Sequence, residues 1–378
     1  MCWDASLPTM NHDWMRLEDE ATAPSPALLI YPDRVEENLH RMISLVGSPT
    51  RLRPHIKTHK LPQIVARQVA LGVTRCKCAT IAEAEMAARA GATDVLLAAQ
   101  QVGPNGQRFL ALIRAFPSVA FSTLADDPGV VATLDREARA AGTTIEVLID
   151  LDVGMGRTGI APGPAALELY RTIATSPGLR AGGLHAFDGH LRQNTLPDRI
   201  AAAADGIAKT DALRAELLRQ SLPVPRVVAG GTPTFPVHAR RPDVECSPGT
   251  CVLSDAGYVT LLPDLDFLHA AVLLTRVISR PGTNRLCLDL GHKSVASEMP
   301  HPRAVFPAIP DAKGVTHSEE HLVIETVRAA DFPVGTAIYA LPWHICPTVA
   351  LHDRVQVVRN GRRVDEWQVT ARVRRLSF

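Results

Sequence analysis

The stretch RPHIKTHK, residues 53–60, places five basic side chains between a short apolar run and a helical pattern. Side chains alternate along a strand, so in an extended chain Arg53, His55 and Lys57 lie on one face. Neighbouring cations favour the neutral form of an amine, and a neutral amine is the nucleophile that forms a Schiff base. The same pattern also fits the solvated end of a basic strand, so its interpretation depends on the flanking sequence.

From about residue 26 to residue 255, β-branched runs alternate with helical patterns rich in Ala and Leu. Such alternation predicts a parallel sheet with helical crossovers. After a leading strand at 27–31, eight strand signals remain, which favours a closed (β/α)8 barrel over an open sheet. These signals lie at 51–57, 74–79, 94–99, 119–123, 144–152, 179–187, 226–230 and 245–253.

The pattern changes after residue 256, where β-rich runs separated by turns replace the helical periodicity. We interpret residues 256–378 as a C-terminal antiparallel β domain, in which Asn360-Gly361 is a hairpin signal. The strand at 27–31 could join this domain rather than the barrel, which we place at 26–255.

Composition excludes several classes of protein. Forty basic and 39 acidic residues leave a formal net charge of +1, and only 4% of residues are aromatic, so nothing indicates a nucleic-acid partner. No apolar run is long enough to span a membrane. Residues 1–25 are acidic and lack the apolar core of a signal peptide, so we expect a partly disordered leader. The seven cysteines are odd in number and scattered, which indicates reduced thiols and predicts a cytoplasmic protein.

Reactive groups in a barrel of this class lie at the C-terminal ends of strands and in the loops that follow. Lys57 occupies such a position. Residues 150–159 are a second candidate, because the carboxylates Asp150 and Asp152 precede Arg157, which lies between glycines and could bind a ring or a carboxylate. An ordinary turn with a surface ion pair explains this second segment equally well.

Two further pairs could carry chemistry. Asp188 and His190 follow a barrel strand and are candidates for proton transfer, although a structural histidine also fits this position. In the C-terminal domain His344 and Cys346 would face the same way along an extended chain, and imidazole with thiolate suits zinc. A buried cysteine beside a hydrogen-bonded histidine is the alternative for the second pair.

Two glycine-containing turns lie at or near the ends of the last two barrel strand signals. Phosphate sites in such barrels commonly use these loops, through backbone N–H groups and hydroxyls. The candidate residues are Gly230, Gly231 and Thr232 in the first turn and Gly249 and Thr250 in the second.

Together these motifs are similar to those of the metal-activated, pyridoxal-phosphate-dependent D-threonine aldolase and D-serine dehydratase family, which has an alanine-racemase-like barrel and a C-terminal β domain. The resemblance covers nearly the whole chain from about residue 25. It implies that Lys57, in Pro54-His55-Ile56-Lys57, is the Schiff-base lysine. It further implies that a divalent metal (Zn, Mn or Mg) binds to His344 and Cys346. The residues that it implies for pyridoxal 5'-phosphate are Lys57, His55, Arg157, Gly230, Gly231, Thr232, Gly249 and Thr250.

The resemblance leaves the reaction open between two lyases. The tail from Pro347 to Arg372 resembles D-threonine aldolases, which cleave D-β-hydroxy-α-amino acids to glycine and an aldehyde. Cys346, in contrast, resembles the ligand of D-serine dehydratases, which release an oxo acid and ammonia. Lys57, Arg157, His190 and Asp188 are the candidate catalytic residues. In the aldolase reaction His190, directly or through water, would be the general base, and in the dehydratase reaction Lys57 would remove the Cα proton.

A family tyrosine just before the Gly-His pair is replaced here by Phe187. A protein that binds pyridoxal phosphate without catalysis is a third possibility, which the C-terminal domain argues against. A racemase is disfavoured because no clear tyrosine partner exists among four tyrosines. The expected partners are a small D-amino acid substrate and, in a homodimer, a second copy of the chain; a monomer is the alternative.

Overall fold

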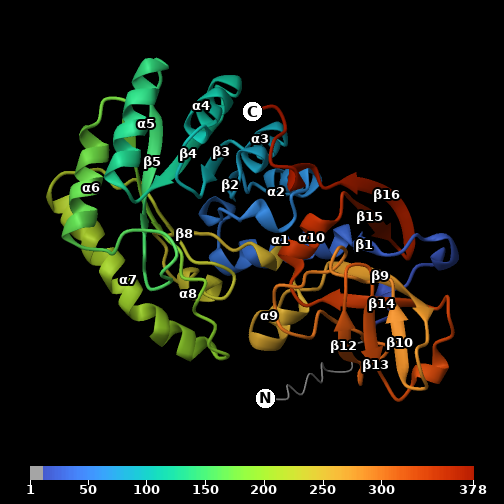
Figure 1. Cartoon of the computed structure of the whole chain (residues 1–378). Coiled ribbons are helices and arrows are strands. Elements are labelled where there is room, and N and C mark those ends of the chain that lie inside the picture. Colours follow the sequence, from blue (N-terminus) through green and yellow to red (C-terminus); the bar gives the residue numbers. More distant parts are fainter. Residues whose placement is uncertain (1–11) are drawn as a thin grey trace. The chain divides into compact units, whose positions relative to one another are not determined.

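The computed structural model describes residues 12–378, and the chain divides into two compact units (Figure 1). The barrel unit consists of residues 41–57, 62–249 and 373–378. Among the described residues, the β unit consists of residues 12–40, 58–61 and 250–372. Each unit is therefore discontinuous in sequence, and the chain passes between them directly after Lys57 and directly after Gly249.

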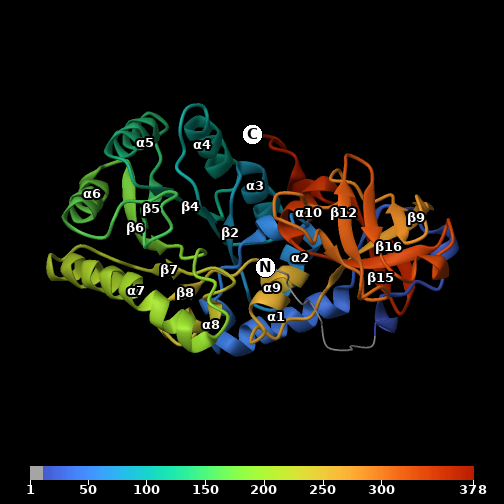
Figure 2. The same ribbon diagram turned by 60° about the horizontal axis from the view of Figure 1, so that its bottom comes forward.

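The barrel unit contains a seven-stranded parallel sheet in which the strands follow their sequence order. Each strand is joined to the next by a crossover that contains a helix, which confirms the predicted βα alternation, and Figure 2 shows helices α4, α5 and α6 outside the strands. The strands are β2 (Arg75–Cys78), β3 (Asp94–Leu97), β4 (Ala120–Ala125), β5 (Ile145–Leu151), β6 (Leu179–Ala186), β7 (Val227–Ala229) and β8 (Glu245–Cys246). The helices are α2 (Pro62–Ala70), α3 (Ile81–Arg89), α4 (Asn105–Ala115), α5 (Pro128–Ala140), α6 (Pro164–Thr175), α7 (Leu196–Arg219) and α8 (Phe235–His238).

Residues 52–55 take the position of the eighth barrel strand. Leu52 forms a parallel bridge with Cys246 of β8, and His55 forms one with Lys77 of β2. The predicted strand at 51–57 is wrong in detail, because Pro54 has no N–H to donate to a ladder and the chain enters a 3-10 turn at Ile56–Thr58. The two bridges nevertheless link the first and last strands, which confirms the predicted barrel.

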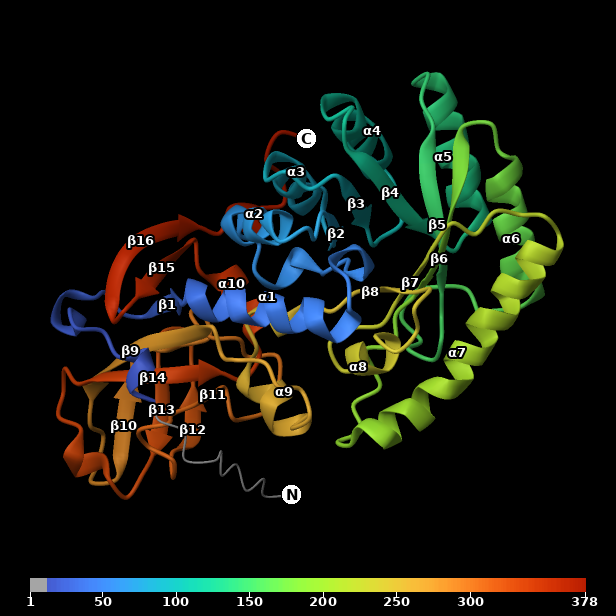
Figure 3. The ribbon, with the colours of Figure 1, turned by 180° about the vertical axis from the view of Figure 1, so that it is seen from behind.

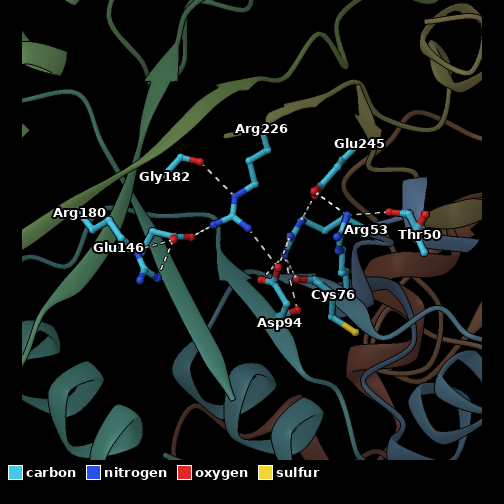
Figure 4. Close-up of polar contacts among 10 residues, drawn as sticks. Thr50, Arg53, Cys76, Asp94, Glu146, Arg180, Gly182, Arg226 and Glu245 are labelled. Carbon is cyan, nitrogen blue, oxygen red and sulfur yellow. Dashed lines mark hydrogen bonds and ion pairs between the residues drawn. The ribbon is translucent and has the colours of Figure 1, made fainter. Parts of the chain in front are cut away.

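Buried charges fill the end of the barrel where the strands begin (Figure 4). Arg53 is fully buried and forms two hydrogen bonds of 2.7 and 2.8 Å with the carboxylate of Asp94, the first residue of β3. Its Nε donates to Glu245, the first residue of β8, at 2.7 Å. Arg226, just before β7, pairs with both Asp94 and Glu146. Burial alone raises the pKa of Asp94, but the bonds from Arg53 hold it below its ordinary value.

The β unit is built around a nine-stranded sheet, seen from behind in Figure 3. Its central strand is β1 (Ala27–Ile30), which pairs antiparallel with β9 (Ala271–Ser279) and parallel with β15 (Arg354–Arg359). The N-terminal strand therefore pairs with strands of the C-terminal half. The other strands are β10 (Arg285–Leu288), β11 (Ala304–Val305), β12 (Lys313–His317), β13 (Leu322–Glu325), β14 (Ala337–Pro342) and β16 (Arg362–Gln368).

The turn between β15 and β16 follows its sequence signal. Asn360 and Gly361 both have positive φ, +48° and +72°, as a two-residue hairpin turn requires. Three helices include residues of the β unit, and only the first has a clear helical pattern in the sequence. They are α1 (Pro32–Val46), which continues into the barrel unit, α9 (Ala256–Leu261) and α10 (Ile345–Leu351).

Part of the expected leader packs into the β unit. Met15 and Leu17 are buried in a core with Leu29 and Tyr31, and the Tyr31 hydroxyl donates to the Met15 carbonyl at 2.6 Å. Residues 1–11 lie outside the described chain. Among residues 12–378 the six cysteines are free thiols, and no helix has the length and apolarity needed to cross a membrane.

We expect Arg53→Met to lower the free energy of unfolding by about 3 kcal/mol, because it removes the fully buried cation that Asp94 and Glu245 share and leaves them only Arg226 and Arg75. Arg180→Met is the matched control: Arg180 also binds a carboxylate, that of Glu146, but its side chain is 67% exposed, so its loss should cost less than about 1 kcal/mol. Urea unfolding measures both values, and equal losses would contradict the assigned role of Arg53.

Candidate active site

The barrel unit holds a cavity of about 380 Å³ where its strands end. Such a volume is in the range of small-molecule sites. Five of its lining residues are basic or imidazole side chains and two are carboxylates, so the cavity suits an anionic ligand. These residues are His55, Lys57, Lys77, Arg157, His185, Asp126 and Asp150.

Lys57 lies in the 3-10 turn at Ile56–Thr58, directly beyond the barrel-closing residues, and lines the cavity. His55 lines it too, and its Nδ1 accepts the backbone N–H of Lys57 at 3.5 Å. Burial, followed by the charges of Lys57 and Lys77, holds the pKa of His55 well below its ordinary value, so this ring is neutral. Arg53 does not line this cavity, because its guanidinium is paired with Asp94 and Glu245 at the opposite end of the barrel.

Three lining residues form a hydrogen-bonded chain that was not predicted from the sequence. Asp150 and His185 are register partners on β5 and β6, and Asp150 Oδ1 lies 2.6 Å from His185 Nδ1. His185 Nε2 lies 3.4 Å from Lys77 Nζ. One feature of the sequence could have indicated this chain. Lys77 lies between two cysteines on a strand, so its side chain must point to the opposite face from theirs.

Arg157 lies in the glycine-bracketed loop after β5. Its guanidinium is 4.9 Å from the ring centroid of Phe187, which also lines the cavity. The loop is held by Asp152, whose Oδ1 accepts the N–H groups of Gly154 and Gly156 at 2.9 and 3.0 Å. Arg157 is exposed and lines the cavity.

The two glycine turns of the barrel unit are in contact. Gly249 donates its N–H to the Thr232 hydroxyl at 3.2 Å. Gly230 has a φ of +79°, and a Cβ at Gly231 would lie 2.8 Å from the ring of Phe187, so the backbone approaches a cavity-lining side chain closely. Thr250 belongs to the β unit, where its hydroxyl lies 3.5 Å from the Cys346 thiol.

Asp188 is buried away from the cavity lining. Its carboxylate accepts from the Thr234 hydroxyl and lies 2.7 Å from His238 Nε2, and Thr234 in turn accepts the N–H of Gly231 at 3.2 Å. This arrangement makes Asp188 a support for the first glycine turn. His190 is exposed and lies beside Gly154, and the cavity is lined without it.

His344 and Cys346 do not lie on an extended strand. β14 ends at Pro342, and α10 begins at Ile345, whose N–H donates to Asp255 at 3.1 Å. The expectation of a shared strand face is therefore wrong. The two side chains still interact: burial alone lowers the pKa of His344, but the hydrogen bond with Cys346 raises it to about 9.

Other groups surround this pair within the β unit. Glu298 pairs with His344 Nδ1, and the hydroxyl of Thr58 lies 3.2 Å from Cys346 Sγ. A carboxylate bound to the second nitrogen of an imidazole orients a metal ligand. Among residues 12–378 no group of three or more His, Cys, Asp or Glu side chains is placed to hold a metal ion.

Comparison with known proteins assigns the family. Residues 30–254 match the alanine racemase N-terminal domain family, and residues 270–358 match the putative serine dehydratase domain family. D-threonine aldolase from an Arthrobacter species is 31% identical in an alignment of 362 residues that covers 93% of this chain and 93% of that protein.

Two solved structures share the architecture. The crystal structure of D-threonine aldolase from Filomicrobium marinum has a TM-score of 0.86 at 32% identity and covers 93% of this chain and 96% of its own. D-threo-3-hydroxyaspartate dehydratase from Delftia sp. HT23 has a TM-score of 0.81 at 25% identity, with 92% and 98% covered, and a mutant of that enzyme was solved in a metal-free form. The chain therefore belongs to the alanine racemase N-terminal domain family, and within it to the lyases that include D-threonine aldolase.

Proposed function

We propose that this protein is a pyridoxal-phosphate-dependent, metal-activated lyase that cleaves D-β-hydroxy-α-amino acids to glycine and an aldehyde. The observation that carries the proposal is the amine of Lys57 in a basic cavity at the C-terminal ends of the barrel strands. The relatedness to D-threonine aldolase over 93% of both chains supports the choice of reaction.

The residues present fit pyridoxal phosphate. A carbonyl compound needs an amine in its site, and a phosphate needs glycine turns that its oxygens can approach. Lys57 supplies the amine. Gly230 and Gly231 supply backbone where a Cβ would lie 2.6 Å from His238 and 2.8 Å from Phe187, and Gly249 contributes the second turn. When bound, the cofactor would accept the electron pair that the substrate leaves on its α-carbon. Arg157, exposed at the cavity wall, would hold an anionic group of the cofactor or the substrate.

The residues also fit a divalent metal with two protein ligands. His344 and Cys346 bring an imidazole nitrogen and a thiol sulfur together, a donor set that zinc accepts, and Glu298 would fix the imidazole ring. Two protein ligands leave positions for water or a substrate hydroxyl. The metal would supply Lewis acidity, which lowers the pKa of a bound hydroxyl.

A dehydratase reaction is the second candidate, and Cys346 is the residue that favours it. The relationship to the hydroxyaspartate dehydratase, at 25% identity, supports the same alternative. The same residues would serve β-elimination, with loss of the hydroxyl in place of cleavage of the carbon–carbon bond. Homodimer formation and a cytoplasmic location stay predictions.

Incubation with D-threonine should yield glycine and acetaldehyde in equal amounts, because retro-aldol cleavage divides the substrate between Cα and Cβ. Lys57→Ala should abolish this activity and the covalent attachment of the cofactor, which borohydride reduction and peptide mapping detect. Lys60→Ala is the matched control and should keep both properties. Release of an oxo acid and ammonia from the wild-type protein would assign the dehydratase reaction instead.

Removal of the metal should remove the activity. We expect stoichiometric metal in the purified protein by elemental mass spectrometry, and its loss in His344→Ala and in Cys346→Ala. Cys287→Ala tests for a nonspecific effect of losing a thiol, because Cys287 lies on β10 and should not affect the metal content. Zn, Mn and Mg added back to the chelated protein would identify the active ion, and full turnover after chelation would exclude a catalytic metal.

A further inference from the structure

The cavity contains a carboxylate–imidazole–amine chain that has no role in the reaction described above. It runs from Asp150 to His185 over 2.6 Å and from His185 to Lys77 over 3.4 Å. All three residues line the cavity that Lys57 also lines. The three residues are nearly inaccessible, with relative exposures of 6% for Asp150, 4% for His185 and 2% for Lys77. A buried polar chain of this kind restricts the position of its terminal amine.

The direction of the hydrogen bonds follows from the charge states. Burial lowers the pKa of His185 more than its bond to Asp150 raises it, so the ring is neutral. Asp150 is an acceptor and therefore takes the Nδ1–H. His185 Nε2 then carries a lone pair and accepts an N–H from Lys77. The remaining positions on Lys77 Nζ have no hydrogen-bond partner within residues 12–378 and are available to a ligand in the cavity.

Lys77 has no carboxylate in direct contact within the described chain. Burial first, and the charge of Lys57 second, lower the pKa of Lys77 to about 7. Two carboxylates raise the pKa of Lys77 in part, Asp150 on β5 and Asp188 after β6. The cation of Arg157, in the loop after β5, lowers it further. Its imidazole neighbours are His55 and His185.

The other groups of the cavity are poorly suited to proton transfer. Both nitrogens of His185 are engaged, and Asp126 is bound by Gln100 and by the N–H of Gly159. His55 is too weak a base near neutral pH, because its pKa is well below the ordinary value. Phe187 has no hydroxyl. Lys57 also lines the cavity, but its amine is assigned to the bond with the cofactor, so the amine of Lys77 is the second, free amine of the cavity.

We propose that Lys77 is the acid–base residue of the cavity, oriented by His185 and Asp150. The chemical step rests on the proposed lyase function. The neutral amine takes the proton of the substrate β-hydroxyl and becomes an ammonium, while the Cα–Cβ bond breaks and the aldehyde C=O forms. The ammonium then returns this proton to the electron pair on Cα, which gives glycine and restores the amine. No other reactant is consumed.

The first test observes the amine directly in the cofactor-loaded protein. The chain has six lysines, at positions 57, 60, 77, 209, 293 and 313, so ¹³Cε-lysine labelling gives few NMR signals. We expect one signal to titrate well below the ordinary range of a lysine, because Lys77 stays buried after Lys57 has bound the cofactor, and we expect this signal to vanish in Lys77→Met. Asp150→Asn should lower this midpoint, because it removes a negative charge that stabilises the ammonium. The proposal fails if no lysine titrates near neutral pH or if the midpoint is unchanged in Asp150→Asn.

The second test separates proton transfer from charge. Lys77→Met should lower kcat about 10²–10⁴-fold, and Lys77→Arg should do the same because arginine keeps the charge but cannot release its proton. Lys209→Met is the matched control, since Lys209 lies on the exposed face of α7, and its kcat should equal that of the wild-type protein. The wild-type kcat should rise with pH through about 7, and this limb should move to lower pH in Asp150→Asn.

The outcomes distinguish the inference from the proposed function. If the wild-type protein cleaves D-threonine and Lys77→Arg retains its kcat, the assignment of Lys77 fails while the lyase function stands. If the wild-type protein releases only an oxo acid and ammonia, the aldolase function fails. The NMR titration then still decides whether Lys77 is an amine with a near-neutral midpoint. A near-neutral midpoint that shifts in Asp150→Asn supports Lys77 as the acid–base residue of the elimination reaction as well.

Discussion

The bridging of β8 and β2 by residues 52–55 is the constraint on which the rest of the barrel unit depends. This segment forms one bridge to each neighbour, with Leu52 on one side and His55 on the other. Without it the seven-stranded sheet is open between its first and last strands. The same residues deliver Lys57 to the cavity, because the chain turns at Ile56–Thr58 as soon as the second bridge is made. The segment that closes the barrel therefore also places the reactive amine of Lys57.

The two ends of the barrel differ in whether their buried groups are stabilised in the charged or in the neutral form. At the end where strands begin, Arg53 pairs with Asp94 and Glu245, and the ionised forms of Arg53 and Asp94 are stabilised. At the end where strands finish, cations outnumber carboxylates, and burial shifts Lys77 and His55 toward their neutral forms. Stability and chemistry are therefore separated along the barrel axis, as is general for this class of fold.

The sequence predicted the features that depend on periodicity and on local turn chemistry. The alternation of strands and helices identified the barrel, and Asn360-Gly361 identified a hairpin. Features that depend on a single residue in a tertiary context escaped prediction. Pro54 interrupts the expected strand at 51–57, and the capping of Ile345 by Asp255 starts a helix where an extended chain was expected. The chain from Asp150 through His185 to Lys77 joins three strand ends, so no local pattern reveals it.

The central place of β1 in the β unit has a consequence for the order of folding. β1 lies between β9 and β15, and more than half of the chain separates it from both partners. During synthesis the barrel segment is complete before either partner strand exists, so β1 must stay unpaired while the barrel forms. Contacts of such long sequence separation form slowly, and a hydrophobic strand with open edges is prone to aggregation in the meantime. We therefore expect the β unit to be the last part of this protein to fold.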